Sequence, residues 1–120
     1  HHRNDPTLMD KVAQINRYHM EQFAKFIAKL KATPDGDGTL LDHTTVVYGS
    51  GISDGNRHNH DALPVLMAGG SRAFRTGRHV KFTESTPVAN LYVSLLDVMG
   101  VPTEKLGDSQ GQLNYLTDVS

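Results

Sequence analysis

Apolar residues recur every three or four positions in the first quarter of the chain, which is the spacing of one face of an α-helix. The repeat follows Asp5-Pro6, where Asp5 is placed to cap a helix and Pro6 suits its first turn. It ends before Thr33–Gly38, a segment rich in turn-forming residues. We predict an amphipathic helix of about six turns that covers a sheet. The repeating positions are Leu8, Val12, Ile15, His19, Phe23, Phe26, Ile27 and Leu30.

Two details of this region have a structural and a functional interpretation. His19 lies within the apolar stripe, and we interpret it as a core histidine with a satisfied ring nitrogen, in preference to a ligand. Asp35 and Asp37 have the spacing of a calcium-binding loop, but the downstream glutamate of an EF-hand is missing. We therefore predict a plain loop there.

Two short apolar runs bounded by glycine and proline predict strands at Thr45–Tyr48 and Leu63–Ala68. A long helix, a short loop and then a nearly continuous apolar strand are typical of α/β proteins with a mostly parallel sheet. A loop rich in Asp, His and Gly lies between the two runs. In α/β proteins such loops, at the ends of buried strands, usually carry the chemistry.

The last third of the chain predicts a small β-hairpin, a second helix and a tail. Residues 72–82 alternate around Thr76-Gly77, as in a hairpin. The charges of this segment indicate a solvated face, with anion binding by one arginine as the alternative. Ser85-Thr86-Pro87 predicts a helix start and Gly100 its end. From Leu106 onward we expect an irregular tail packed on the surface. The hairpin charges are Arg72, Arg75, Arg78 and Lys81, and the stripe expected to be buried in the second helix is Val88, Leu91, Tyr92, Leu95, Leu96 and Met99.

Composition excludes several classes of protein. The 120 residues suit one domain, and 12 Lys plus Arg against 13 Asp plus Glu give a net charge of -1. This balance offers no electrostatic attraction to nucleic acid. Without cysteine there is no disulfide framework, and no apolar run approaches the roughly 20 residues of a membrane span.

The loop between the predicted strands carries the candidate ligands. His58 and His60 are two residues apart, which in extended backbone places both rings on one side, about 7 Å apart at Cα. They suit a single divalent ion (Zn, Mn or Ca), to which Asp54 or Asp61 would add a carboxylate. The alternative is a polar loop whose histidines cap backbone groups.

Ser50 and Ser53 lie in the same loop but do not indicate a nucleophile. The segment lacks the GxSxG form of a nucleophile elbow. We expect both hydroxyls to make hydrogen bonds within turns.

Five segments of the chain carry a resemblance: GSGISDGNRHNHDALPVLMAGG, NRYHMEQFAKFIAKL, GRHVKF, TPVANLYVSLLDVMGV and GDSQGQL. Together they closely resemble the C-terminal part of a bacterial family of unknown function. That family is named for an HXXSHH motif and is abundant in planctomycete-type bacteria. The resemblance covers nearly the whole chain. By composition alone His1-His2 suggests the remnant of a purification tag, whereas the resemblance makes it the end of the HXXSHH motif.

The family is similar in turn to the alkaline-phosphatase and sulfatase superfamily. The resemblance implies an α/β fold, the C-terminal portion of an alkaline-phosphatase-like mixed sheet with two long covering helices and a small β-hairpin. Residues 1–120 would be a single domain or the C-terminal fragment of a longer one. Ser50-Gly51 takes the place of the superfamily's metal-ligand pair, and His58 or His60 matches its later histidine. Neither Ser50 nor Gly51 is a good ligand for a divalent ion.

The loop residues and the resemblance are compatible with two functions, so the sequence leaves open whether the chain is an enzyme. The first is an exported metal-dependent hydrolase of phosphate or sulfate esters, with His58, His60 and Asp54 as metal ligands and His2 joining them. The second is a non-catalytic protein that binds or assembles at the cell surface. The implied partners are the N-terminal remainder of the same chain and further copies of it, without nucleic acid or a membrane span. The implied location is outside the cytoplasm.

Overall fold

A computed structural model describes residues 1–70, 74–82 and 84–116. The chain forms two compact units, His1–Gly70 and Ser71–Ser120. The first holds a long helix and two small antiparallel sheets, and the second holds a shorter helix and its surrounding loops. This mixture of helices and strands is consistent with the predicted α/β class. Along the described parts of the chain, neither helix combines the length and hydrophobicity needed to cross a membrane.

Helix α1 (Pro6–Ala32) confirms the first predicted element and its start. The Asp5 carboxylate accepts hydrogen bonds from the backbone N–H groups of Thr7 (2.8 Å) and Leu8 (3.1 Å), and Pro6 occupies the first turn. Two donors that would otherwise lack partners are thereby satisfied. The helix ends at Ala32, and the next residue, Thr33, caps it with an N–H that bonds to the Leu30 carbonyl at 3.3 Å.

A small hairpin follows α1 directly. Strands β1 (Pro34–Asp35) and β2 (Gly38–Thr39) pair antiparallel, with Asp35 opposite Gly38. We predicted a plain loop here, whereas the structure has two short paired strands joined by a two-residue turn. Gly36 has φ +58°, a conformation that glycine adopts without steric cost.

Strands β3 (Thr45–Gly49) and β4 (Val65–Gly69) confirm both apolar runs but correct the predicted direction of pairing. They form an antiparallel ladder in which Gly49 lies opposite Val65. The prediction of a mostly parallel sheet was wrong for this pair, because the connection turns back on itself instead of crossing over through a helix. Pro64 has no N–H to donate to a ladder, and β4 begins at the next residue.

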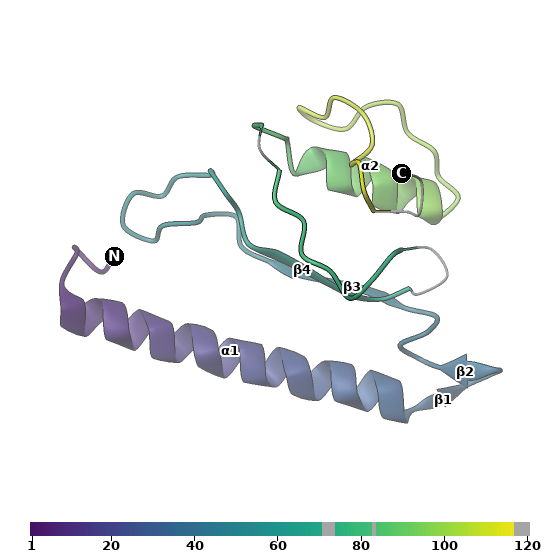
Figure 1. The fold of residues 1–120 in the computed structure, drawn as a ribbon, viewed down its shortest axis with the longest axis horizontal. Coiled ribbons are helices and arrows are strands. Elements are labelled where there is room, and N and C mark those ends of the chain that lie inside the picture. The colour runs from purple at the N-terminus through teal and green to yellow at the C-terminus, as the bar shows by residue number, and fades with distance from the viewer. Residues whose placement is uncertain (71–73, 83, 117–120) are drawn as a thin grey trace. The chain divides into compact units, whose positions relative to one another are not determined.

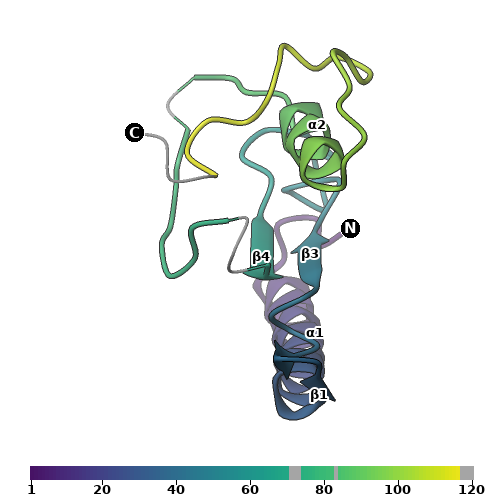
Figure 2. The same cartoon turned by 90° about the vertical axis from the view of Figure 1, so that its right-hand side faces the viewer.

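Helix α1 covers one face of the β3–β4 ladder. The rings of Phe23 and Tyr48 lie 5.0 Å apart at their centroids, and Leu66, opposite Tyr48, shares its face of the sheet. Figure 2 shows α1 below the two strands, which lie side by side.

Much of the apolar stripe of α1 remains exposed. No residue of this helix is buried, and Ile15 and Phe26 are 56% and 49% exposed. The prediction of a core histidine at position 19 was wrong, because His19 is exposed. Its ring makes an edge-type contact with the ring of Tyr18, with the two centroids 5.9 Å apart. The apolar repeat thus identified the helix correctly, but only a short part of its face finds a partner in this unit.

In the second unit, helix α2 (Ala89–Val98) is confirmed, although it is shorter than the long covering helix expected. Leu91 of the predicted stripe is buried, but the rest of the buried face differs from that stripe. Asn90 and Ser94 are buried because they bind the tail: Asn90 Oδ1 accepts the Gln110 N–H at 2.9 Å and Ser94 Oγ the Leu113 N–H at 2.8 Å. The expected packing of the tail is therefore confirmed for its described part, which ends at residue 116.

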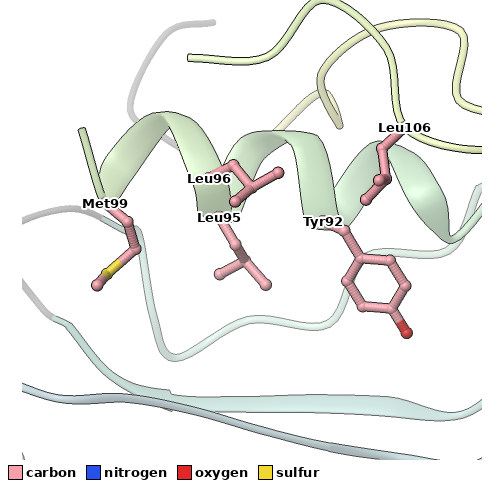
Figure 3. Close-up of a pocket in the computed structure, with 5 residues that line it drawn as sticks. All are labelled: Tyr92, Leu95, Leu96, Met99 and Leu106. Carbon is pink, nitrogen blue, oxygen red and sulfur yellow. The ribbon is translucent and has the colours of Figure 1, made fainter. Parts of the chain in front are cut away.

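Part of the stripe predicted to be buried lines an apolar depression instead. Tyr92 and Met99 are exposed, and they project from the same side of α2 as Leu95 (Figure 3). Leu106 approaches from the tail. The depression is lined by Tyr92, Leu95, Leu96, Met99 and Leu106.

The hairpin predicted over residues 72–82 is not formed by the residues described there. Residues 74–82 contain no strand, and Arg72 lies outside the described part of the chain. Arg75, Arg78 and Lys81 are exposed, and Arg78 Nε donates to the Arg75 carbonyl at 3.0 Å. Alternation alone failed here because these side chains are mostly polar and offer little to pack on a sheet face.

Replacing Gly69 by alanine should destabilise the first unit. Gly69 has φ +79°, and an added Cβ would overlap the Thr44 carbonyl oxygen and lie 2.6 Å from that of Leu41. A left-handed non-glycine residue costs about 1–3 kcal/mol, and the overlap adds to this cost. We expect the urea midpoint to fall clearly for G69A. The matched control is G55A, where a Cβ meets nothing within 4 Å; equal midpoints for the two variants would contradict the structure.

Candidate functional site

The loop of residues 50–64 joins β3 to β4 and is braced from within. At its base the Ser50 N–H bonds to the Pro64 carbonyl at 3.4 Å. Asn59 Oδ1 accepts the Ser53 hydroxyl at 2.9 Å and the Asp54 N–H at 3.2 Å, and the Ser53 N–H bonds back to the Asn59 carbonyl at 3.0 Å. Because these bonds span five or six residues, they hold the two arms of the loop together.

The serines have the structural role that the sequence predicts. Ser50 Oγ donates to the Ile52 carbonyl at 2.7 Å, and Ser53 Oγ donates to Asn59. Both hydroxyls are thus engaged in the turns of the loop.

Asp54 organises the turn that carries His58. Its Oδ1 accepts the backbone N–H groups of Asn56 (2.7 Å) and Arg57 (3.0 Å), and its carbonyl accepts the His58 N–H at 2.8 Å. This is the arrangement of an N-cap on a single turn. His58 itself has φ +56°, a left-handed conformation that ends the turn.

These hydrogen bonds favour the ionised carboxylate. The pKa of Asp54 is lowered from its ordinary value, chiefly because the Arg57 N–H and then the Asn56 N–H donate to it. Partial desolvation acts in the opposite direction, and the contact with His2 lowers the pKa further by a smaller amount.

The N-terminal segment lies against this turn (Figure 1). His2 Nε2 is 3.3 Å from Asp54 Oδ1, and the Arg3 N–H donates to Asn56 Oδ1 at 3.1 Å. The His2 carbonyl in turn accepts the Asp5 N–H at 2.8 Å at the start of α1. The helix start, the first residues and the loop are therefore joined by a continuous set of hydrogen bonds, which we call the N-terminal clasp (residues 1–5 with Asp54 and Asn56).

The hydrogen bonds of His2 fix its tautomer. Its Nδ1 accepts the Asn4 N–H at 3.1 Å, so the proton of the neutral ring is on Nε2 and points to Asp54. A Ser-His-Asp relay needs the second ring nitrogen free to take a proton from a nucleophile. Here that nitrogen is occupied by backbone, so the His2–Asp54 pair is not such a relay. A metal ion would bind His2 only by replacing the Nε2 proton.

His1 and His58 form a stacked pair. Their ring centroids are 4.5 Å apart and their planes differ by 15°. His58 is an exposed residue even with this contact. This contact brings a second histidine of the N-terminal segment to the loop.

His60 is oriented by backbone. Its Nδ1 lies 2.6 Å from the Gly51 carbonyl oxygen. A carbonyl oxygen only accepts, so Nδ1 carries the proton and Nε2 has a free lone pair. Metal-binding histidines are commonly held in this way, with one ring N–H donated to a backbone carbonyl and the other nitrogen facing the ion. The same bond also fits the alternative predicted from the sequence, in which a histidine of the loop caps a backbone group.

The structure brings together some of the residues predicted as ligands. His2 contacts Asp54, and His58 is beside His1, whereas the ring bond of His60 goes to Gly51. The carboxylate of Asp61 accepts the side-chain amide of Asn59 at 3.3 Å. Within the described ranges, no three His, Cys, Asp or Glu side chains already form a site for one ion.

Sequence reasoning missed the two asparagines that build the site. Asn59 braces the loop and Asn56 holds the N-terminal segment. Their positions beside Gly55 and between the histidines are typical of turn residues, which is the one signal that marks them. Nothing in the sequence indicates that Asn56 reaches Arg3.

Comparison with protein-family models, with curated proteins and with solved structures gives no match to the chain. The resemblance to the HXXSHH family, the alkaline-phosphatase-like fold and the location outside the cytoplasm therefore stay predictions.

The hydrogen bonds to Asp54 predict how the loop responds to acid. Since the pKa of Asp54 is lowered in the folded chain, its contribution to stability is present above the ordinary carboxyl value of 3.8 and is lost as pH falls through the lowered value. A carboxyl ¹³C titration should give a midpoint below 3.8. The amide signals of Asn56 and Arg57 should follow the same curve and lose it in D54N. A midpoint at or above 3.8 would contradict the hydrogen bonds described.

Proposed function

We propose that this chain belongs to an exported hydrolase of phosphate or sulfate esters that uses a divalent metal ion held by His60, His58, Asp54 and His2. The observation that carries the proposal is the hydrogen bond from His60 Nδ1 to the Gly51 carbonyl, because it leaves Nε2 as a lone-pair donor on an exposed ring. The N-terminal clasp adds a second support, since it holds His2 beside Asp54.

The donor set suits some ions better than others. Imidazole nitrogen combined with carboxylate oxygen favours Zn²⁺ or Mn²⁺, whereas Ca²⁺ prefers sites made of oxygen ligands. An ion bound here would supply a water molecule of lowered pKa and polarise the ester. The chain's own part is to orient His60 through Gly51 and to keep the Asp54 carboxylate ionised through Asn56 and Arg57.

A second function, binding or assembly at the cell surface without catalysis, is favoured by a different observation. The apolar side chains of Ile15, Tyr18 and Phe26 are 56%, 59% and 49% exposed on α1. Exposed apolar surface of this kind commonly marks contact with another protein surface. The Ser50-Gly51 pair, which offers no ligand at the superfamily's position, favours the same function.

Calorimetric titration with Zn²⁺ and Mn²⁺ tests the metal proposal. We expect near-stoichiometric binding to the unaltered chain and at least about tenfold weaker binding to H60A, the loss typical of disturbed metal sites. H58A should weaken binding as well. The matched control is H19A, which removes an exposed histidine on α1 and should bind as the unaltered chain does.

Two results separate the functions. Binding that is absent, or that is equal in H60A and H19A, would contradict the metal site and leave the binding or assembly function. Metal binding that depends on His60, without hydrolysis of aryl phosphate or aryl sulfate esters, would contradict only the catalytic part.

A further inference from the structure

One exposed side of helix α1 combines apolar residues with lysines. Ile15, Tyr18 and Phe26 are all exposed. Ile15 and Tyr18 line an open depression on the helix together with Lys11. At 3.6 residues per turn, Phe26 lies about 20° and Tyr18 about 60° from Ile15 around the helix axis. We call this side the open face of α1, and it consists of Lys11, Ile15, Tyr18, Lys25, Phe26 and Lys29.

The charges of α1 are divided between its sides. The three lysines of the open face lie about 40–80° from Ile15 around the axis. Asp10 and Glu21, the two acids of the helix, lie about 120–140° from Ile15 and so point away from this face. The open face is therefore cationic as well as apolar.

Cations are also concentrated on this helix as a whole. α1 holds five Lys or Arg and two Asp or Glu, a net charge of +3. The whole chain has a net charge of -1, so the remaining residues together carry -4. The balanced composition thus conceals a basic amphipathic helix, a type of element that binds membrane surfaces.

The β3–β4 ladder covers a different side of α1. The residues of the covered side are half-buried and lie about 60–120° from Ile15 around the axis; they are Phe23, Ile27 and Leu30. A strand of five residues spans about 17 Å, whereas the helix is about 40 Å long. The ladder is therefore too short and too narrow to cover the open face as well.

We propose that the open face of α1 binds the surface of a membrane that contains anionic lipids, with the helix lying in the plane of that surface. Ile15, Tyr18 and Phe26 enter the boundary between headgroups and acyl chains, and the lysines extend their ammonium groups to the lipid phosphates. This inference goes beyond the functions proposed above, because neither metal-dependent hydrolysis nor assembly with other proteins requires a lipid surface.

The lysines favour a lipid surface over a second protein as the occupant of this face. Lysine is depleted in protein–protein interfaces, where its flexible side chain loses both water and rotamer freedom. At a bilayer its aliphatic stem packs on apolar surface while its charge stays beside the phosphates. Tyr18 has an apolar ring with a polar hydroxyl, and such rings are enriched at membrane interfaces. Charge complementarity thus selects an anionic bilayer.

Flotation of the full chain with lipid vesicles tests the inference. The vesicles contain one part phosphatidylglycerol to two parts phosphatidylcholine, and the control vesicles contain phosphatidylcholine alone. EDTA in all samples makes the result independent of metal binding by the loop. We expect the chain to float with the anionic vesicles at low salt, to bind the neutral vesicles less, and to lose binding as salt screens the charges.

A pair of charge variants tests the direction of binding. K11E/K29E reverses two charges of the open face and should weaken binding to anionic vesicles at least about tenfold, because each lysine near such a surface contributes severalfold. The matched control is R17E/K31E. It changes the net charge equally, but at positions about 160° from Ile15 around the axis, and should retain most of the binding.

A second pair tests the apolar part. I15Q should weaken binding about fivefold or more, since it removes an apolar side chain that enters the lipid. M20Q changes an exposed methionine about 140° away and should bind as the unaltered chain does. All four variants introduce good helix formers at exposed positions, so the circular dichroism of the helix should be unchanged.

The inference is overturned if the unaltered chain does not float with the anionic vesicles at low salt. It is also overturned if R17E/K31E loses as much binding as K11E/K29E, or if I15Q and M20Q bind equally. A dimer in sedimentation velocity that dissociates in I15Q, without vesicle binding, would assign the open face to a second copy of the chain instead.

Discussion

The backbone ladder between β3 and β4 is the constraint on which the candidate site depends. By placing Gly49 opposite Val65, it brings together the two ends of the loop of residues 50–64. The polar residues of the loop can then bond to one another across a short distance. At the other end of the ladder, Gly69 runs so close to the Thr44 carbonyl that no side chain is tolerated there. The geometry of the loop, and any chemistry it supports, thus depends on the ladder and its glycines.

Helix α1 brings the N-terminal histidines to that loop. A helix of 27 residues is about 40 Å long. From its first residues the chain runs along α1, turns at the β1–β2 hairpin and returns through β3 (Figure 1). The loop that follows β3 therefore lies beside the first residues, where the Arg3 N–H bonds to Asn56. The ladder covers α1 in part, where Phe23 packs on Tyr48. The remaining apolar surface of the helix is open to a further partner.

How much of this follows from sequence differs from element to element. The start of α1 is predictable because Asp5 and Pro6 act locally. Whether β3 and β4 pair parallel or antiparallel is not predictable in this way. A run of apolar residues indicates a strand covered on both faces, and such a strand can pair in either direction. In α2 the predicted stripe failed at Tyr92, since the burial of Asn90 depends on a hydrogen bond to a residue 20 positions away.

The site shows the same division. Spacing and residue types marked His58, His60 and Asp54 as candidate ligands, and the approach of His2 to Asp54 was expected only through the family resemblance. The tautomers of His2 and His60 depend on the backbone groups of Asn4 and Gly51, which no side-chain pattern indicates. Chemistry that depends on main-chain partners therefore becomes visible only in the folded chain.

The most direct test of the account is a nuclear Overhauser measurement between the aromatic rings of the metal-free chain. The account predicts cross-peaks between the ring protons of His1 and His58, whose centroids are 4.5 Å apart. Absence of these cross-peaks, with the first residues giving random-coil shifts, would contradict the convergence of the N-terminal histidines with the loop.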